Sequence, residues 1–167
     1  MFLGDIDSDP APRSTRCATT SSCSARANIR RRAFLQDADD DLIPPDSGDF
    51  AADLRDWLRR LAGFLGESDS GAVFRALLAQ AQHDPAFAGE FRSCCLGPQR
   101  RRDRALLERA VTAGRLPAGL DLETETDQLV GPLYYRALVS AGPVGEEFTD
   151  ALADAFLLRR GGPASAR

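Results

Sequence analysis

Apolar residues recur every three or four positions from Phe50 to near the end of the chain, the spacing of one face of an α-helix. The first stripe ends at Gly66, a residue type that commonly terminates helices. Asp69 or Ser70 is the expected N-cap of the next helix. The two stripes consist of Phe50, Leu54, Trp57, Leu58, Leu61, Phe64 and Leu65, and of Val73, Phe74, Leu77, Leu78 and Ala81. Two amphipathic helices are therefore predicted.

The segment "HDPAF" predicts the start of a third helix, with Asp84 as N-cap and Pro85 at the first helical position, where a missing N–H costs little. Its inward stripe is expected to contain Phe87, Phe91, Cys94 and Cys95. Gly97-Pro98 is expected to break or kink this helix, and Gly114 to end the next one. Asp121 is the expected N-cap of the helix that follows. No stretch alternates with period two over the length of a strand. The predicted fold class is therefore all-α, a helical bundle of about six to seven helices.

The stretch "DQLVGPLYYRALVSAG", Asp127 to Gly142, is apolar over much of its circumference. A helix of this kind must be buried by more than one neighbour. The last helix is similarly broad, so the two could pack on their own domain with one side and on a second copy with the other. Burial inside one monomer is an equally good reading of the pattern. The expected dimer contacts are Val130, Leu133, Ala137, Phe148, Leu152 and Phe156.

The first 45 residues differ from the rest, because Ser, Thr, Ala, Pro and Arg dominate and no apolar period is present. Such a segment buries too little surface to offset its ordering entropy. We expect residues 1–45 to be a mostly disordered tail and linker. Residues 46–160 are expected to form the helical domain, and 161–167 a second disordered tail.

A net charge of −4 and a pI near 5.0 argue against a chain that coats nucleic acid or anionic membrane. No apolar run approaches the roughly 18 residues that a membrane span needs. The four cysteines lack the spacing of a disulfide framework or a zinc site. We therefore expect a cytoplasmic protein without a membrane partner.

Catalytic and metal-binding patterns are weak. Asp5, Asp7 and Asp9 imitate the start of a calcium loop, but Pro10 stands where that loop needs glycine. His83 is the only histidine and is expected at the surface. Adjacent Cys94 and Cys95 are interpreted as buried thiols, with a redox sensor as the alternative. "RRRDR", residues 100–104, is interpreted as a solvated face. The prediction is no metal, no cofactor and no enzyme activity.

Four segments occur in an order that resembles a known family. They are "DLRDWLRRLAGFL", "FRALLAQAQHDPAFAGEFR", "RALLERAVTAGRL" and "DQLVGPLYYRALVSAGPVGEEFTDALADAFL". Together they resemble the C-terminal domain of tetracycline-repressor (TetR) family transcriptional regulators, from about Asp37 to Arg160. The resemblance implies an all-helical domain that dimerises through its last two long helices. It also implies a cavity for a small effector between the earlier helices, and so favours the dimer reading.

The resemblance places a small apolar or aromatic effector in such a cavity. Its wall is expected to include Trp57, Phe74, Leu78, Phe91, Cys94 and Tyr134, with tyrosine hydroxyls and Gln128 as orienting polar groups. The expected function is thus ligand binding and homodimerisation in a TetR-type regulator.

Family members begin with a helix-turn-helix unit, and nothing similar precedes Asp37. "DADDDLIPPDSGDF" does resemble the family's linker. We expect a shifted reading frame or misplaced start, with DNA binding only if the helix-turn-helix head is restored. The alternative function is a helical interaction protein that dimerises with an intact relative and modulates it.

Overall fold

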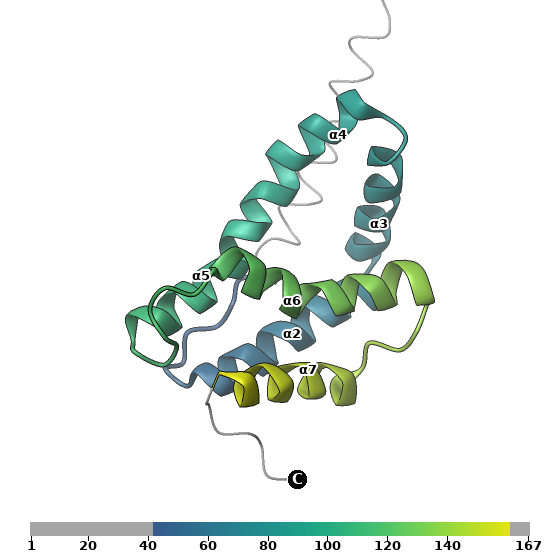
Figure 1. Cartoon of the computed structure of the whole chain (residues 1–167). Helices are drawn as coiled ribbons and strands as arrows, with labels where there is room; N and C mark the ends of the chain where they lie inside the picture. Colours follow the sequence, from purple (N-terminus) through teal and green to yellow (C-terminus); the bar gives the residue numbers. More distant parts are fainter. Residues whose placement is uncertain (1–41, 161–167) are drawn as a thin grey trace, which may run out of the picture. The chain divides into compact units, whose positions relative to one another are not determined.

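The computed structural model describes residues 42–160, which form an all-helical body without a strand in that range (Figure 1). This confirms the predicted all-α class. The expectations for residues 1–41 and 161–167, including the missing DNA-binding head and the aspartates at positions 5, 7 and 9, lie outside the described residues. The helices are α2 (Phe50–Gly66), α3 (Asp69–Ala81), α4 (Pro85–Phe91), α5 (Gly97–Thr112), α6 (Leu122–Tyr135) and α7 (Glu146–Arg159). Two π-helical segments, η1 (Arg92–Leu96) and η2 (Arg136–Ser140), extend α4 and α6.

Side-chain caps fix where several helices begin. Asp84 accepts a hydrogen bond from the Phe87 N–H at 3.0 Å, and Asp121 accepts one from the Thr124 N–H at 3.2 Å, as the sequence predicted. The cap of α3 is Ser68, whose hydroxyl accepts from the Gly71 N–H at 2.8 Å. The predicted cap therefore lay one or two residues too late.

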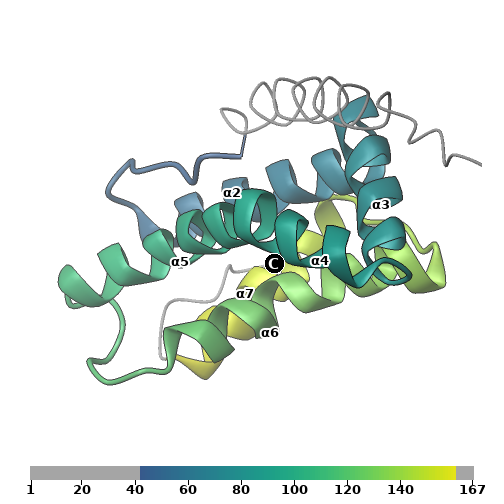
Figure 2. The same cartoon turned by 90° about the horizontal axis from the view of Figure 1, so that it is seen from above.

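Gly97-Pro98 does not separate two helices. The chain passes from α4 through η1 into α5 without a break, and Figure 2 shows the run as one long helix. The Gly97 N–H bonds to the Arg92 carbonyl, which widens the turn just before the proline ring would meet the preceding backbone. Counted as one, this run leaves five helices among the described residues, slightly fewer than predicted.

Helix α2 lies at the centre of the body and contacts α3, α5, α6 and α7 (Figure 1). Its predicted stripe is confirmed, since Leu54, Trp57, Leu58, Leu61 and Leu65 are all buried. Burial of each leucine stabilises the fold by roughly 1.5–3 kcal/mol relative to an exposed position. The hydrophobic effect therefore fixes α2 as the element on which the others pack.

Helices α6 and α7 run antiparallel side by side, with α2 packed against both (Figures 1 and 2). Arg55 of α2 pairs with Asp154 of α7 at 2.6 Å, in a partly buried position. The buried Glu125 of α6 pairs with Arg159 and Arg160 at the C-terminal end of α7. These pairs fix the register of α7 in addition to its apolar contacts.

The segment before α2 packs on α5. Leu42 is buried, and the Arg109 guanidinium donates a hydrogen bond to the Pro45 carbonyl at 2.6 Å. The Ser47 hydroxyl donates to the buried Asp53 carboxylate at 2.6 Å. Residues 42–45, expected in the tail and linker, thus have defined contacts with the helical body.

Candidate functional site

An aromatic cluster occupies the space between α2, α3, α4 and α6. Phe74 lies at its centre, with ring centroids 5.6 Å from Phe64, 5.8 Å from Phe91 and 6.3 Å from Tyr134. Phe87 stacks on Phe91 at 5.7 Å. These separations and tilted orientations are the ones that aromatic pairs favour. Phe64, Phe87 and Tyr134 are only half-buried, so the cluster reaches from the core to the surface.

Polar side chains meet the inner end of this aromatic cluster. The Gln99 amide donates to the Asp103 carboxylate at 2.7 Å, and Arg102 donates to the Gln99 carbonyl oxygen at 2.9 Å. Trp57 and Tyr134 lie close enough to the Asp103 carboxylate to interact with it electrostatically. We call Trp57, Gln99, Asp103 and Tyr134 the polar cluster. It joins α2, α5 and α6 inside the domain.

Burial dominates the electrostatics of the polar cluster. Asp103 is only 4% exposed, and its desolvation raises the pKa of the carboxyl group to about 6. The Gln99 hydrogen bond and the Trp57 N–H oppose this effect by stabilising the carboxylate. Burial, and secondarily the Asp103 charge, raises the pKa of the Tyr134 hydroxyl, which therefore stays protonated at neutral pH.

One donor in the polar cluster is unsatisfied. The indole N–H of Trp57 is fully buried and has no hydrogen-bond partner within residues 42–160. The N–H lies close enough to the Asp103 carboxylate to stabilise its charge, but the two groups do not have the geometry of a hydrogen bond. Buried N–H groups are rarely left without an acceptor. This site therefore has the capacity to bind one more polar atom.

The structure brings together some of the predicted effector-site residues. Trp57, Phe74 and Phe91 are buried, and Leu78 and Tyr134 are half-buried beside the core. The other two predicted wall residues, Cys94 and Gln128, are exposed.

Both thiols were predicted to be buried on the inward stripe of the helix, and this prediction is wrong. Cys94 is exposed and Cys95 is half-buried. A π-helical turn holds more residues than an α-turn. The phase predicted from 3.6 residues per turn therefore fails in the segment Arg92–Leu96.

The sequence interpretation missed Gln99 and Asp103. The run at 100–104 was taken as solvated, and its outer members agree: Arg100 pairs with Glu123 at 2.5 Å and Arg104 pairs with the same carboxylate at 3.0 Å. Positions 99 and 103, however, share the inward face of α5 with buried positions 106, 107 and 110. Position 103 follows position 99 by four residues and precedes position 106 by three, and this helical spacing could have predicted that both side chains face inward.

Large apolar side chains are exposed at two places on α6, η2 and α7. Tyr135 (60% exposed) ends α6, and Leu138 (39%) and Val139 (68%) lie in η2, whereas Leu158 (72%) lies at the C-terminal end of α7. Gly131, Ala151 and Ala155 are exposed along the same two helices, and a Cβ added to Gly131 would meet nothing within 4 Å. We call these the exposed α6–α7 residues.

Two of the six predicted dimer contacts have other roles in the structure. Leu133 is 0% exposed and Phe156 is buried, so both belong to the core of the described body. Val130, Ala137, Phe148 and Leu152 are half-buried and pack against that core. The sequence pattern assigned to the partner two side chains that the structure places in the core of α6 and α7, and the dimer contact itself remains a prediction.

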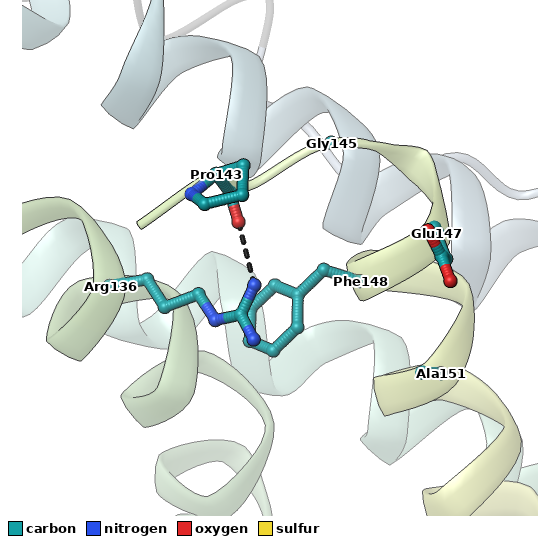
Figure 3. Close-up of a pocket in the computed structure, with 6 residues that line it drawn as sticks. All are labelled: Arg136, Pro143, Gly145, Glu147, Phe148 and Ala151. Atoms are coloured by element: carbon teal, nitrogen blue, oxygen red, sulfur yellow. Dashed lines mark hydrogen bonds between the residues drawn. The ribbon is translucent and has the colours of Figure 1, made fainter. Parts of the chain in front are cut away.

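A pocket of about 380 Å³ lies where η2 connects to α7 (Figure 3). The Arg136 guanidinium stacks over the Phe148 ring at 3.7 Å and donates to the Pro143 carbonyl at 2.8 Å. Both interactions hold the α6–α7 connection in place. The cation that lines this pocket is therefore already engaged by contacts within the domain.

The described residues, 42–160, match neither the pattern of a metal site nor that of a membrane-spanning helix. No group of three or more His, Cys, Asp or Glu side chains there is arranged to hold a metal ion. No helix in this range has the length and apolarity that crossing a membrane requires. His83 is exposed, as predicted.

Comparison with known proteins gives a consistent result. The family described as "Tetracyclin repressor-like, C-terminal domain" matches residues 44–156. The uncharacterized HTH-type transcriptional regulator YdeS of Bacillus subtilis (strain 168) is 33% identical over 134 residues, which are 80% of this chain and 67% of that protein. The crystal structure of the TetR family transcription regulator SCO0332 superposes with a TM-score of 0.73 at 26% identity, covering 84% of this chain and 80% of that chain. The chain therefore belongs to the tetracycline-repressor family of transcriptional regulators, and the matched part is the C-terminal domain of that family.

Proposed function

We propose that this chain provides the dimerisation and effector-binding functions of a TetR-type regulator. The observation that carries the proposal is the set of exposed α6–α7 residues, where Tyr135, Val139 and Leu158 are each at least 60% exposed. Soluble proteins seldom leave several large apolar side chains exposed along two neighbouring helices unless another surface covers them. A second copy of the same helix pair is the proposed cover.

The geometry of α6 and α7 suits a two-fold contact. Two adjacent antiparallel helices from each copy form a four-helix arrangement when they meet across a two-fold axis. The exposed Gly131, Ala151 and Ala155 carry little or no side chain, which permits close approach of a facing helix. The large residues Tyr135, Val139 and Leu158 then supply most of the buried apolar area.

The proposed effector site consists of the aromatic cluster and the polar cluster at its inner end. Apolar walls with a few convergent polar groups are typical of small-molecule sites. An effector bound there contacts α2, α5 and α6 together. Binding that favours one arrangement of these helices would shift the population of dimer conformations, which is how such a regulator responds to a ligand.

Light scattering coupled to gel filtration tests the dimer. The parent chain is expected to elute as a dimer at micromolar concentration. Val139→Asp with Leu158→Asp is expected to elute as a folded monomer, because two desolvated charges oppose association. Val73→Asp, on the exposed side of α3, is the matched control and is expected to remain dimeric. A parent monomer, or a dimeric double variant, would reject the proposal.

Leu133 is unsuitable for this test. Its side chain is fully buried in the described body, so Leu133→Asp would bury a charge and unfold the monomer itself. Far-UV circular dichroism of the Val139 and Leu158 variants must match the parent, which separates loss of association from loss of folding.

A further inference from the structure

Two polar groups in the polar cluster have unused hydrogen-bonding capacity and lie near each other in the core. The Trp57 N–H lacks an acceptor among the described residues. The Asp103 carboxylate receives the Gln99 amide on Oδ1 at 2.7 Å, and a carboxylate can accept several such bonds. Both side chains are buried, and each influences the other electrostatically. A ligand group that satisfies both side chains must accept a hydrogen bond from the indole and donate one to the carboxylate.

Chemical groups differ in whether they meet both demands. An ammonium group donates but cannot accept, so it would leave the Trp57 N–H unsatisfied. A carboxylate accepts but would face the negative charge of Asp103. An ether accepts without donating. A hydroxyl group does both with one oxygen atom, which suits two partners that lie near each other.

The surroundings select for an apolar body. Tyr134 belongs to the polar cluster and also contacts Phe74, which continues to Phe64, Phe91 and Phe87. The rings extend from Tyr134 to the half-buried Phe64 and Phe87, so the apolar surroundings continue to the surface. An aromatic or aliphatic body along this path would exchange water for stacking and dispersion contacts.

We propose that Trp57 and Asp103 form the hydroxyl-binding end of the effector site, which takes an uncharged apolar molecule with one hydroxyl group, a phenol or a hydrophobic alcohol. This inference rests on the proposed effector-binding function and specifies its ligand chemistry. The Trp57 indole donates to the ligand oxygen, and the ligand hydroxyl donates to the Asp103 carboxylate. Gln99 holds the carboxylate in position from the other side.

Isothermal titration of the full chain tests the selectivity with three matched probes. They are para-propylphenol, its methyl ether para-propylanisole, and para-propylbenzylamine, which differ at the polar end only. The phenol is expected to bind at least tenfold more tightly than either of the others, because only the phenol satisfies both protein groups. Trp57 is the only tryptophan, so a shift of its fluorescence emission on phenol binding places the ligand at this end of the site.

Two variants assign the roles. Trp57→Phe removes the N–H and keeps an aromatic ring, and Asp103→Asn replaces a charged acceptor with a neutral one. Each is expected to weaken phenol binding about tenfold. Asp103→Asn should leave the affinity for the ether unchanged, whereas Trp57→Phe should weaken ether binding as well, because the ether oxygen also accepts from the indole. Asp56→Asn, at an exposed carboxylate of α2, is the matched control and should change neither affinity.

The outcomes separate this inference from the proposed function. Equal affinity for phenol and ether would overturn the hydroxyl assignment while effector binding stands. Tighter binding of the amine would overturn it in favour of cation recognition. Absence of binding by all three probes would reject both the inference and this effector site, and a water molecule bridging Trp57 and Asp103 would then be the expected occupant.

Discussion

Replacing Asp103 with asparagine is expected to stabilise the chain at neutral pH. The carboxyl group is buried in α5, and the amide that replaces it keeps an acceptor for the Gln99 hydrogen bond. Burial raises the pKa of Asp103 from 3.8 to about 6. A carboxyl group with a raised pKa in the folded state prefers to be protonated there, so its ionisation destabilises the fold.

The sign and size follow from proton linkage. Below pH 3.8 the group is neutral in both states and has no effect on the stability difference. Between pH 3.8 and about 6 the unfolded chain has lost the proton and the folded chain has kept it, so stability falls by about 1.4 kcal/mol per pH unit. Above about pH 6 the loss is constant at up to about 3 kcal/mol. Asp103→Asn removes this loss.

Urea unfolding followed by circular dichroism at pH 4, 5, 6, 7 and 8 measures the effect. The free energy of unfolding of the variant minus that of the parent should grow from pH 4 to 6 and then level off. Asp56→Asn, which breaks an exposed pair with Arg60, should change the free energy by less than about 0.5 kcal/mol. A difference for Asp103→Asn that is independent of pH, or a variant less stable than the parent at pH 7, would refute the argument that burial dominates this carboxylate.

Three further changes test other parts of the structure by urea unfolding. Ala141 has a left-handed backbone conformation, with φ of 49°, so Ala141→Gly should stabilise the chain by about 0.5–1 kcal/mol. The control Ala76→Gly, inside α3, should destabilise the chain by a similar amount. Glu125→Gln should cost about 1–3 kcal/mol, because it weakens a buried carboxylate's pairs with two arginines; a loss no larger than that of an exposed pair would contradict this. Arg109→Ala should cost about 1 kcal/mol and speed hydrogen exchange in residues 42–49, since it removes the hydrogen bond to the Pro45 carbonyl; unchanged exchange would show that this bond does not hold the segment.

Much of the local structure could be predicted because it depends on neighbours in the chain. The apolar period identified the central helix α2, and Asp84 and Asp121 were correctly assigned as caps. The apolar period predicts the wrong side of the helix for a residue where the helix geometry changes, as for Cys94 in the π-helical turn. Whether Gly97-Pro98 ends a helix or is absorbed into a wider turn depends on what packs around it, and adjacent residues do not carry that information.

The candidate site was only partly predictable. Phe74, Phe91 and Tyr134 were chosen as aromatic residues on inward faces, and they do meet in one cluster. Asp103 was overlooked because it stands among arginines, a composition typical of solvated helix faces. Its partners Trp57 and Tyr134 come from other helices, so the arrangement exists only in the folded domain.

By itself, the sequence determined the all-α class, the apolar stripe of α2, and the family resemblance, because each rests on residue type and spacing along the chain. The tertiary structure alone decided which apolar residues of α6 and α7 face the core and which face outward. A helix that is apolar on two sides has no sequence signal that separates the two. The packing of α6 on α2 and α5, and of α7 on α2, buries Leu133 and leaves Tyr135, Val139 and Leu158 exposed.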